Sequence, residues 1–430
     1  MIPWWNKLRY RLPGGAEKQF QDGLAALEAN KHTDAVRLLL PAAKAGVAEA
    51  QRNVGLAYLM GMGVPGDPVE AVYWLRRASA SGDAQAQHRL GFLLASGMIS
   101  EKTGHQGRRW VAAAEKAGDT AHRKTKELLF PRGLEVELIE GEGIEWCRRA
   151  ASAGVRDAQS YLGALLARGK GSPADIEEGK EWLRRAAENG SPDADFHLGV
   201  LALQQDPPDY ATARVHFLPA AEAGHPDAQF NLGLMMSRGQ GGEVDVRQSA
   251  RWYRKAARQG HINAQINLST VLMGSRNSRD RREALRWCRA AALQGAAVAQ
   301  FNYGRLFEQG DGVRQALPEA VAWYGRAAEQ GYAAAQLKLA VMYSRGEGVP
   351  RSAEQAANWC RKAAEQGHPM AQANLGLFYA SGRGLPRDIT AARRWYDEAL
   401  KRLPEGRERD AVAARLAALP SGGETRPRAR

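Results

Sequence analysis

One aromatic position recurs every 35 or 36 residues along nearly the whole chain. A fixed period of this length is typical of a repeat protein, in which each unit contacts its neighbours and one core runs through the array. The 430 residues therefore need no division into two or three globular domains. The recurring aromatic position holds Trp74, Trp110, Trp146, Trp182, Phe217, Trp252, Trp287, Trp323, Trp359 and Trp395. One period before Trp74, Leu38 occupies the same position.

Each period contains two helical blocks. Alanine follows the aromatic residue at the fourth position, which places both on one helix face, and a glycine follows seven or eight residues after it. Such a glycine suits the left-handed end of a helix. The other block begins with Ala-Gln, as at Ala228-Gln229 and Ala371-Gln372, with a large apolar residue four positions after the alanine. We call the Ala-Gln block helix A and the aromatic block helix B, and we predict that the aromatic ladder points inward as a continuous core.

The A-to-B connection usually contains a Gly-x-Gly pair, as in Gly310-Asp311-Gly312. Together with Ala-Gln-Phe-Asn-Leu-Gly (228–233) and Trp-Tyr-Arg-Lys-Ala-Ala-Arg-Gln-Gly (252–260), this loop resembles Sel1-like repeats, which are relatives of tetratricopeptide repeats. The resemblance covers about residues 20–400. It implies an all-α fold, a right-handed superhelical solenoid of about eleven helix hairpins, whose A helices line the concave surface.

The chain outside the regular repeats divides into several segments. We expect a basic N-terminal extension with a tryptophan pair (1–15), the repeat solenoid (16–405), a capping helix (406–419) and a disordered basic tail (420–430). Unit 119–150 is atypical because its Ala-Gln block is missing. Its residues Phe130, Leu134 and Leu138 belong either to a reshaped loop or to a specialised contact with a partner.

The sequence shows no pattern typical of an enzyme or of a cofactor or metal site. Gly61-x-Gly63-x-x-Gly66 resembles a dinucleotide-binding pattern but follows a predicted helix instead of a strand. The nine histidines have no metal-site spacing. The three cysteines each follow a repeat tryptophan at a position that tyrosine shares, so we predict that they are buried packing residues. We expect no cofactor and no catalytic activity.

Positive charge gathers just after the aromatic residue, as at Arg148-Arg149 and Arg254-Lys255, and the net charge is +13. This predicts a basic stripe on helix B, which is either a solvated face or a surface that attracts an acidic protein, nucleic acid or an anionic membrane. Nucleic-acid binding is not favoured, because the aromatic residues needed for base stacking are predicted to be buried.

The sequence has no run of 18 apolar residues that would span a membrane. Its first residues lack the apolar stretch of a secretion signal, so we predict a cytoplasmic protein. Trp4 and Trp5 either dock on the first repeat or contact a membrane interface peripherally.

Varied residues occupy the position two after the helix A alanine, on an otherwise uniform scaffold. Arg52, His88, Phe196, Phe230 and Phe301 are the candidate partner-binding residues, and aromatic residues often dominate such interfaces. Inter-repeat packing is the alternative role for this position. We therefore predict a non-enzymatic scaffold or adaptor that binds a protein partner. The alternative function is a cell-envelope protein that binds or processes peptidoglycan or exopolysaccharide.

Overall fold

The computed structural model describes residues 16–96, 141–168, 173–275 and 277–420. These residues form 21 helices and no strand. By their contacts they divide into two compact units, Met1–Ala223 and Gly224–Arg430, which are described separately.

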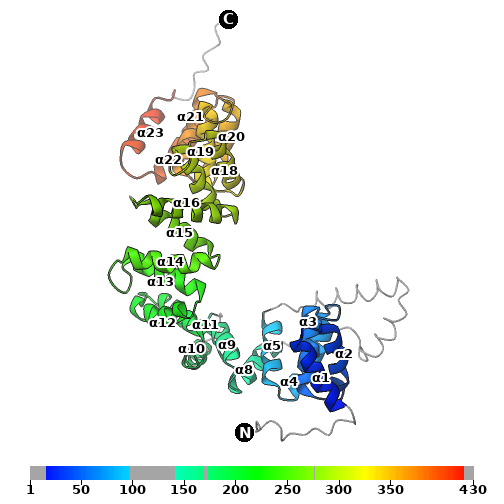
Figure 1. The fold of residues 1–430 in the computed structure, drawn as a ribbon. Helices are drawn as coiled ribbons and strands as arrows, with labels where there is room; N and C mark the ends of the chain where they lie inside the picture. The colour runs from blue at the N-terminus through cyan, green and yellow to red at the C-terminus, as the bar shows by residue number, and fades with distance from the viewer. Residues whose placement is uncertain (1–15, 97–140, 169–172, 276, 421–430) are drawn as a thin grey trace, which may run out of the picture. The chain divides into compact units, whose positions relative to one another are not determined.

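The first unit contains five helical hairpins, each made of an A helix that packs along the B helix paired with it (Figure 1). The hairpins are α1 (Ala16–Glu28) with α2 (His32–Lys44), α3 (Ala48–Met60) with α4 (Pro68–Ala80), α5 (Ala84–Ala95) with α8 (Glu142–Ser152), α9 (Arg156–Arg168) with α10 (Pro173–Glu188), and α11 (Pro192–Leu203) with α12 (Tyr210–Glu222).

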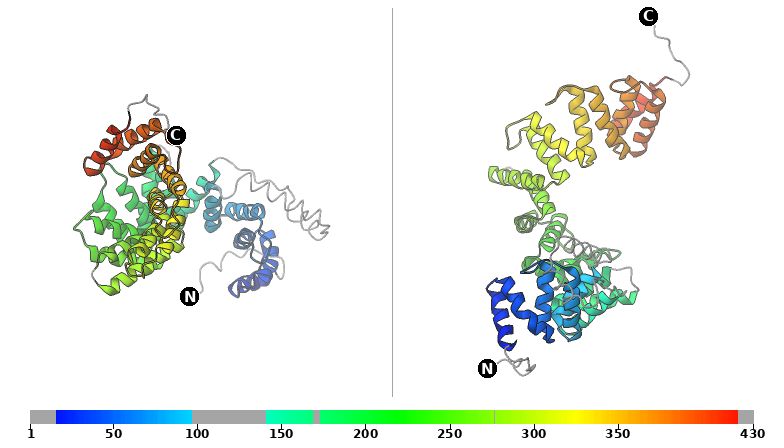
Figure 2. Two further views of the ribbon diagram at one scale, coloured as in Figure 1. Left: turned by 90° about the horizontal axis from the view of Figure 1, so that it is seen from above. Right: turned by 90° about the vertical axis from the view of Figure 1, so that its right-hand side faces the viewer.

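The second unit repeats this arrangement five times, and successive hairpins lie beside one another in chain order (Figure 2). The hairpins are α13 (Pro226–Arg238) with α14 (Val246–Arg258), α15 (Ile262–Met273) with α16 (Ser278–Leu293), α17 (Ala297–Gln309) with α18 (Leu317–Glu329), α19 (Ala333–Arg345) with α20 (Ala353–Glu365), and α21 (Pro369–Ser381) with α22 (Ile389–Arg402). The solenoid of helical hairpins predicted from the period is confirmed.

The pairing of α5 with α8 differs from the sequence prediction. The 36-residue step from Trp74 through Trp110 to Trp146 suggested a further complete unit between them. In the structure α5 supplies the A helix for α8, and a β-carbon on Gly91 would lie 2.6 Å from Sγ of Cys147. The described residues therefore form ten hairpins; Trp110 lies outside the described residues.

The recurring tryptophans pack against the core clusters, but most of them lie less deep than the sequence predicts. Trp74 and Trp252 are buried, whereas the other described tryptophans of the ladder are half-buried. The deepest position is the next residue along helix B. It faces helix A of its own hairpin and is at most 3% exposed in all ten hairpins: Leu39, Leu75, Cys147, Leu183, Phe217, Tyr253, Cys288, Tyr324, Cys360 and Tyr396. We call it the inner position.

Phe217 belongs to the inner position and not to the tryptophan position. A β-carbon on Gly199 would lie 2.6 Å from the Phe217 ring, just as one on Gly233 would lie 2.9 Å from the Tyr253 ring. His216 therefore takes the tryptophan position in this hairpin. The spacing contained the signal: Gly224 follows Phe217 by seven residues, whereas the tryptophans precede their glycine by eight.

Glycines in the connections adopt the left-handed backbone region, as the sequence predicted. Gly310 and Gly312 have φ of 71° and 74°, and Gly310 ends α17. The second glycine of the pair also allows a close approach, because a β-carbon on Gly348 would lie 2.6 Å from the backbone carbonyl carbon of Leu317 at the start of α18. The loops that contain Gly63, Gly348 and Gly384 therefore pack on the neighbouring hairpin.

After the last hairpin comes one more helix, α23 (Arg407–Ala417). Its Val412 is 2% exposed and joins a core cluster with Tyr396, Ala399 and Leu403. One apolar residue of α23 thus covers the end of α22.

Candidate partner-binding surface

The glutamine of the Ala-Gln pair joins neighbouring hairpins. Nε2 of Gln336 in α19 donates to the carbonyl oxygen of Ala328 near the end of α18, at 3.0 Å. Its Oε1 accepts from Nε2 of Gln366, which follows α20, at 2.7 Å. The same buried amide bond to the preceding B helix is made by Gln51, Gln87, Gln159, Gln265, Gln300 and Gln372. The motif is structural: it adds a second hydrogen bond to a helix-end carbonyl that already accepts from a backbone N–H, as Ala328 does from Gly331, and it ties each A helix to the preceding B helix.

Two of the predicted partner-binding residues are engaged within the array. Arg52 forms ion pairs with Asp83 at 2.6 Å and with Glu49 at 3.2 Å. His88 is only 8% exposed, and its burial lowers the pKa of the imidazole. Since Asp83 also caps α5, Arg52 contributes to the junction between two hairpins.

The three predicted phenylalanine anchors are half-buried and contact the inner position of their own hairpin. The Phe196 and Phe217 ring centroids lie 5.9 Å apart. Phe230 lies 5.9 Å from Tyr253 and stacks on His261 at 4.6 Å. His261 caps the next A helix. Phe301 has the same two kinds of neighbour, Tyr324 and Tyr332, each at 5.3 Å. These contacts favour the packing role for this position.

The next residue along each A helix forms a polar row that the sequence analysis did not single out. In the second unit it is half-buried in all five hairpins: Asn231, Asn267, Asn302, Lys338 and Asn374. We call this set the asparagine row. Nδ2 of Asn267 donates to the Tyr253 hydroxyl at 3.3 Å. Asn231, Asn302 and Asn374 make no side-chain hydrogen bond to any residue that the structure describes. Their constant offset of three from the helix A alanine was visible in the sequence.

The basic stripe on helix B is partly engaged within the array. In three of the described hairpins the first basic residue after the tryptophan forms a forked ion pair with a glutamate on the next B helix: Arg254 contacts both carboxylate oxygens of Glu283, at 2.7 and 3.1 Å. Glu283 also accepts from Nε1 of Trp287 at 3.1 Å. The hydrogen bonds from Arg254 hold the pKa of the Glu283 carboxyl below its usual range. Arg76 with Glu142 and Arg148 with Glu178 repeat this arrangement.

The basic residue three positions after the tryptophan covers the indole of its own helix. Nζ of Lys255 lies 3.8 Å from the Trp252 ring centroid, and Cζ of Arg326 lies 4.2 Å from that of Trp323. These are cation–π distances. Six of the helix B indoles are therefore covered by cations of the same chain, Trp74, Trp146, Trp182, Trp252, Trp323 and Trp359, which leaves these faces unsuited to stacking on bases.

Cys147, Cys288 and Cys360 are free and buried, as predicted. Burial raises the pKa of each thiol to about 12, so each remains a neutral packing group. Within the described residues no group of His, Cys, Asp and Glu could hold a metal ion. In the same part of the chain, no helix has the length and apolar character to cross a bilayer. Trp4, Trp5, Phe130, Leu134 and Leu138 lie outside the described residues.

Hairpins that pack in series, each with a buried inner position and most of them joined to the preceding hairpin by the glutamine hydrogen bonds described above, define an α-helical repeat protein. The chain belongs to the Sel1 repeat family. The Sel1 repeat model matches residues 48–83, 140–155, 156–191, 192–225, 226–261, 262–295, 297–332, 333–368 and 369–402. None of these ranges lies between 83 and 140, where α5 and α8 are joined. Sel1 repeat proteins are in general scaffolds for interactions between proteins.

Two solved structures resemble the whole chain. One is c5321, a protective antigen present in uropathogenic Escherichia coli strains that displays an SLR fold. It is 30% identical over 94% of this chain and 89% of its own, with a TM-score of 0.56. The other is a Sel1 repeat protein from Oxalobacter formigenes, 28% identical over 84% of this chain and 92% of its own, also with a TM-score of 0.56. No curated protein matches the chain significantly.

Proposed function

We propose that this chain is a non-enzymatic scaffold that binds a protein partner along the A helices of its second unit. The observation that carries the proposal is the asparagine row. A side-chain amide offers both a donor and an acceptor, which are the groups that the backbone of an extended partner segment presents. One such amide in most hairpins would hold a segment largely independently of its side chains.

Helix stability does not account for these asparagines. Asparagine in a helix is less favourable than alanine by roughly 0.5 kcal/mol. Asn231, Asn302 and Asn374 do not offset this by hydrogen bonds to the described residues. On helix B, by contrast, several glutamates, arginines and tryptophans are joined to one another, as Arg254, Glu283 and Trp287 are. These two observations favour the A helices as the recognition surface.

The test is photo-crosslinking in native cells. A photoreactive amino acid is placed on the A helices at Thr270 or Leu377, which are both exposed, and on helix B at the exposed Arg286 as control. We expect a discrete adduct with a protein from the first two positions and none from the third. Equal adducts from both surfaces, or an adduct from Arg286 alone, would contradict the proposal.

A loss-of-binding variant complements the crosslinking. Replacing Asn231, Asn302 and Asn374 together by alanine should weaken capture of the crosslinked partner without lowering the melting temperature, because alanine is the better helix former. Unchanged capture would show that the asparagine row has no part in recognition.

We also propose a cytoplasmic location. Cell fractionation checks this directly: recovery with the cytoplasmic fraction is expected. Recovery with the envelope would favour the alternative in which the chain binds peptidoglycan or exopolysaccharide.

A further inference from the structure

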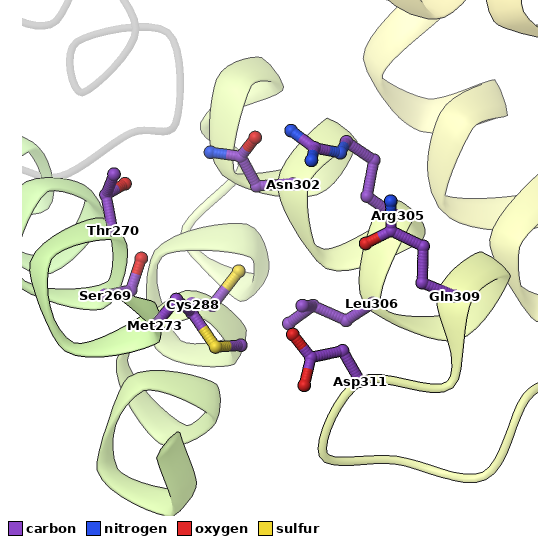
Figure 3. Close-up of a pocket in the computed structure, with 9 residues that line it drawn as sticks. All are labelled: Ser269, Thr270, Met273, Cys288, Asn302, Arg305, Leu306, Gln309 and Asp311. Atoms are coloured by element: carbon purple, nitrogen blue, oxygen red, sulfur yellow. The ribbon is translucent and has the colours of Figure 1, made fainter. Parts of the chain in front are cut away.

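A pocket of about 330 Å³ opens between the A helices α15 and α17 of the second unit (Figure 3). Asn302 and Arg305 lie at one end of it and Asp311 lies at the other, with the sulfur atoms of Met273 and Cys288 between them. Its lining consists of Ser269, Thr270, Met273, Cys288, Asn302, Arg305, Leu306, Gln309 and Asp311.

The pocket occupies the volume that a tyrosine side chain fills in the hairpins on either side. Cys288 is at the inner position, where the hairpin before has Tyr253 and the hairpin after has Tyr324. The Tyr253 hydroxyl lies 3.4 Å from Ser237 on its own A helix and 3.3 Å from Asn267 on the next one. The corresponding residues around Cys288 are Met273 and Asn302, and both line the pocket. Because the thiol is much smaller than a phenol, the space between them stays open.

The same substitution leaves polar groups without partners. Asn302 faces a thiol in place of the hydroxyl that Asn267 contacts. Within the described residues, Asn302, Arg305 and Gln309 make no side-chain hydrogen bond, and Arg305 has no ion-pair partner within 4 Å. Donors at the pocket rim are therefore available to a ligand.

The charge around the pocket favours an anion. Asp311 is paired with Arg281 at 3.6 Å. Glu308, one turn beyond Arg305, is paired with Lys338 at 2.6 Å and accepts from the Tyr324 hydroxyl at 2.6 Å. Both carboxylates are thus compensated by other groups, and the Arg305 guanidinium is the cation in excess.

We propose that this pocket binds an acidic residue of the partner segment. The carboxylate of this residue pairs with the planar guanidinium of Arg305 and accepts a hydrogen bond from the side-chain amide of Asn302. The apolar side chain next to the acidic residue enters the space beside Met273, Cys288 and Leu306. The inference rests on the proposed function, and it adds that the partner is selected by an acidic residue adjacent to an apolar one.

The experiment is selection from a displayed random-peptide library on the purified full-length chain. Three variants are selected in parallel: Arg305→Gln, the pocket-filling double variant Ser269→Gly/Cys288→Tyr, and the control Arg286→Gln, which removes an exposed charge from α16. The double variant copies the Gly233 and Tyr253 pair, in which glycine is needed because a β-carbon would lie 2.9 Å from the tyrosine ring. It therefore closes the pocket with packing that the chain already uses.

We expect the wild-type chain and Arg286→Gln to enrich peptides with Asp or Glu beside an apolar residue. Arg305→Gln and the double variant should lose that preference. For the best acidic peptide, Arg305→Gln should weaken binding about ten- to hundredfold, the usual effect of removing a hydrogen-bonded charge.

The outcomes separate the two proposals. If peptides are enriched without a common acidic residue, or if Arg305→Gln selects the same peptides, the pocket proposal is overturned while the scaffold function stands. If the chain enriches no peptide at all, both are contradicted. Melting curves of each variant establish that it is folded before the selections are compared.

Discussion

A β-carbon built on Gly304 of α17 would lie 2.9 Å from two ring carbons of Tyr324 on α18. Gly233 with Tyr253 and Gly376 with Tyr396 show the same close approach. Where the inner position holds the smaller cysteine, helix A carries a larger residue in two hairpins: Ser269 with Cys288, and Ala340 with Cys360. The match in volume therefore holds for the glycine–tyrosine hairpins and for Ala340 with Cys360, whereas Ser269 with Cys288 leaves the pocket open and Cys147 faces Gly91.

Gly304→Ala should destabilise the second unit by about 1–3 kcal/mol, the usual range for overpacking a core. Tyr324→Cys alone should also destabilise it, because it leaves a cavity. The double variant Gly304→Ala/Tyr324→Cys copies the Ala340 and Cys360 pair, so its loss should be smaller than the sum of the two single losses. Urea unfolding of the four proteins measures the coupling, and strict additivity would refute the volume match.

Glu70 should make stability depend on pH. It occupies the position of Glu283, but Leu40 stands on the preceding B helix where Arg254 provides the cation. Glu70 is 1% exposed, and burial, with the charge of Asp67 second, raises its pKa to about 8. Between the usual value of 4.5 and about 8, the folded carboxyl keeps its proton while the unfolded one releases it, so stability falls as the pH rises.

Glu70→Gln should remove this loss of stability. The difference in the free energy of unfolding between the variant and the wild type should therefore increase in the variant's favour as the pH rises through that range. Leu40→Arg should also stabilise the chain at alkaline pH by supplying the missing cation. The control is Glu283→Gln, which should lose stability against the wild type at neutral pH and recover under acid, because the Glu283 pKa is lowered. Denaturant unfolding at several pH values decides; a Glu70→Gln curve parallel to the wild type would contradict the assignment.

Replacing one glutamine of the Ala-Gln pairs by alanine should lower the free energy of unfolding more inside the array than at its end. Gln336 makes hydrogen bonds to Ala328 and to Gln366, whereas Gln372 donates to Ala364 and its buried Oε1 has no partner. Gln336→Ala should therefore destabilise the chain by about 1 kcal/mol more than Gln372→Ala, since one hydrogen bond more is lost. Thermal unfolding of the two variants compares their stabilities. Equal losses of stability would contradict a stabilising role for the hydrogen bond between Gln336 and Gln366.

Val412 should anchor α23 on the last hairpin. Val412→Asp replaces a buried apolar side chain with a charge, and we expect a loss of at least about 2 kcal/mol together with aggregation on heating. Ala413→Asp, one residue on and exposed, is the control and should have little effect. Deleting residues 406–430 should expose the same apolar surface; a truncated chain as soluble and heat-stable as the full one would show that α23 is dispensable.

Most of the candidate surface could not be assigned from sequence. The position of Phe230 and Phe301 varies between units, which predicts recognition, yet each packs between its own inner tyrosine and the start of the next helix. No sequence pattern distinguishes Asn302 and Arg305, because their role depends on Cys288 being small. The pocket forms only where three helices meet, so no sequence pattern within one helix predicts it.

The sequence by itself determined the helical hairpin, its period and its glycine-rich turns, because these follow from local helical spacing and from backbone conformations that only glycine adopts freely. Tertiary structure alone decided which helix is the partner of which and how deep each side chain lies. The segment around Trp110 kept the period, yet α5 pairs with α8. Most of the conspicuous tryptophans lie half-buried, several of them under cations, while the residue after each fills the core. Neighbouring positions on a helix differ by about 100° in direction, so the packing of helix A against helix B, and not the recurrence of a large residue, sets which of the two is buried.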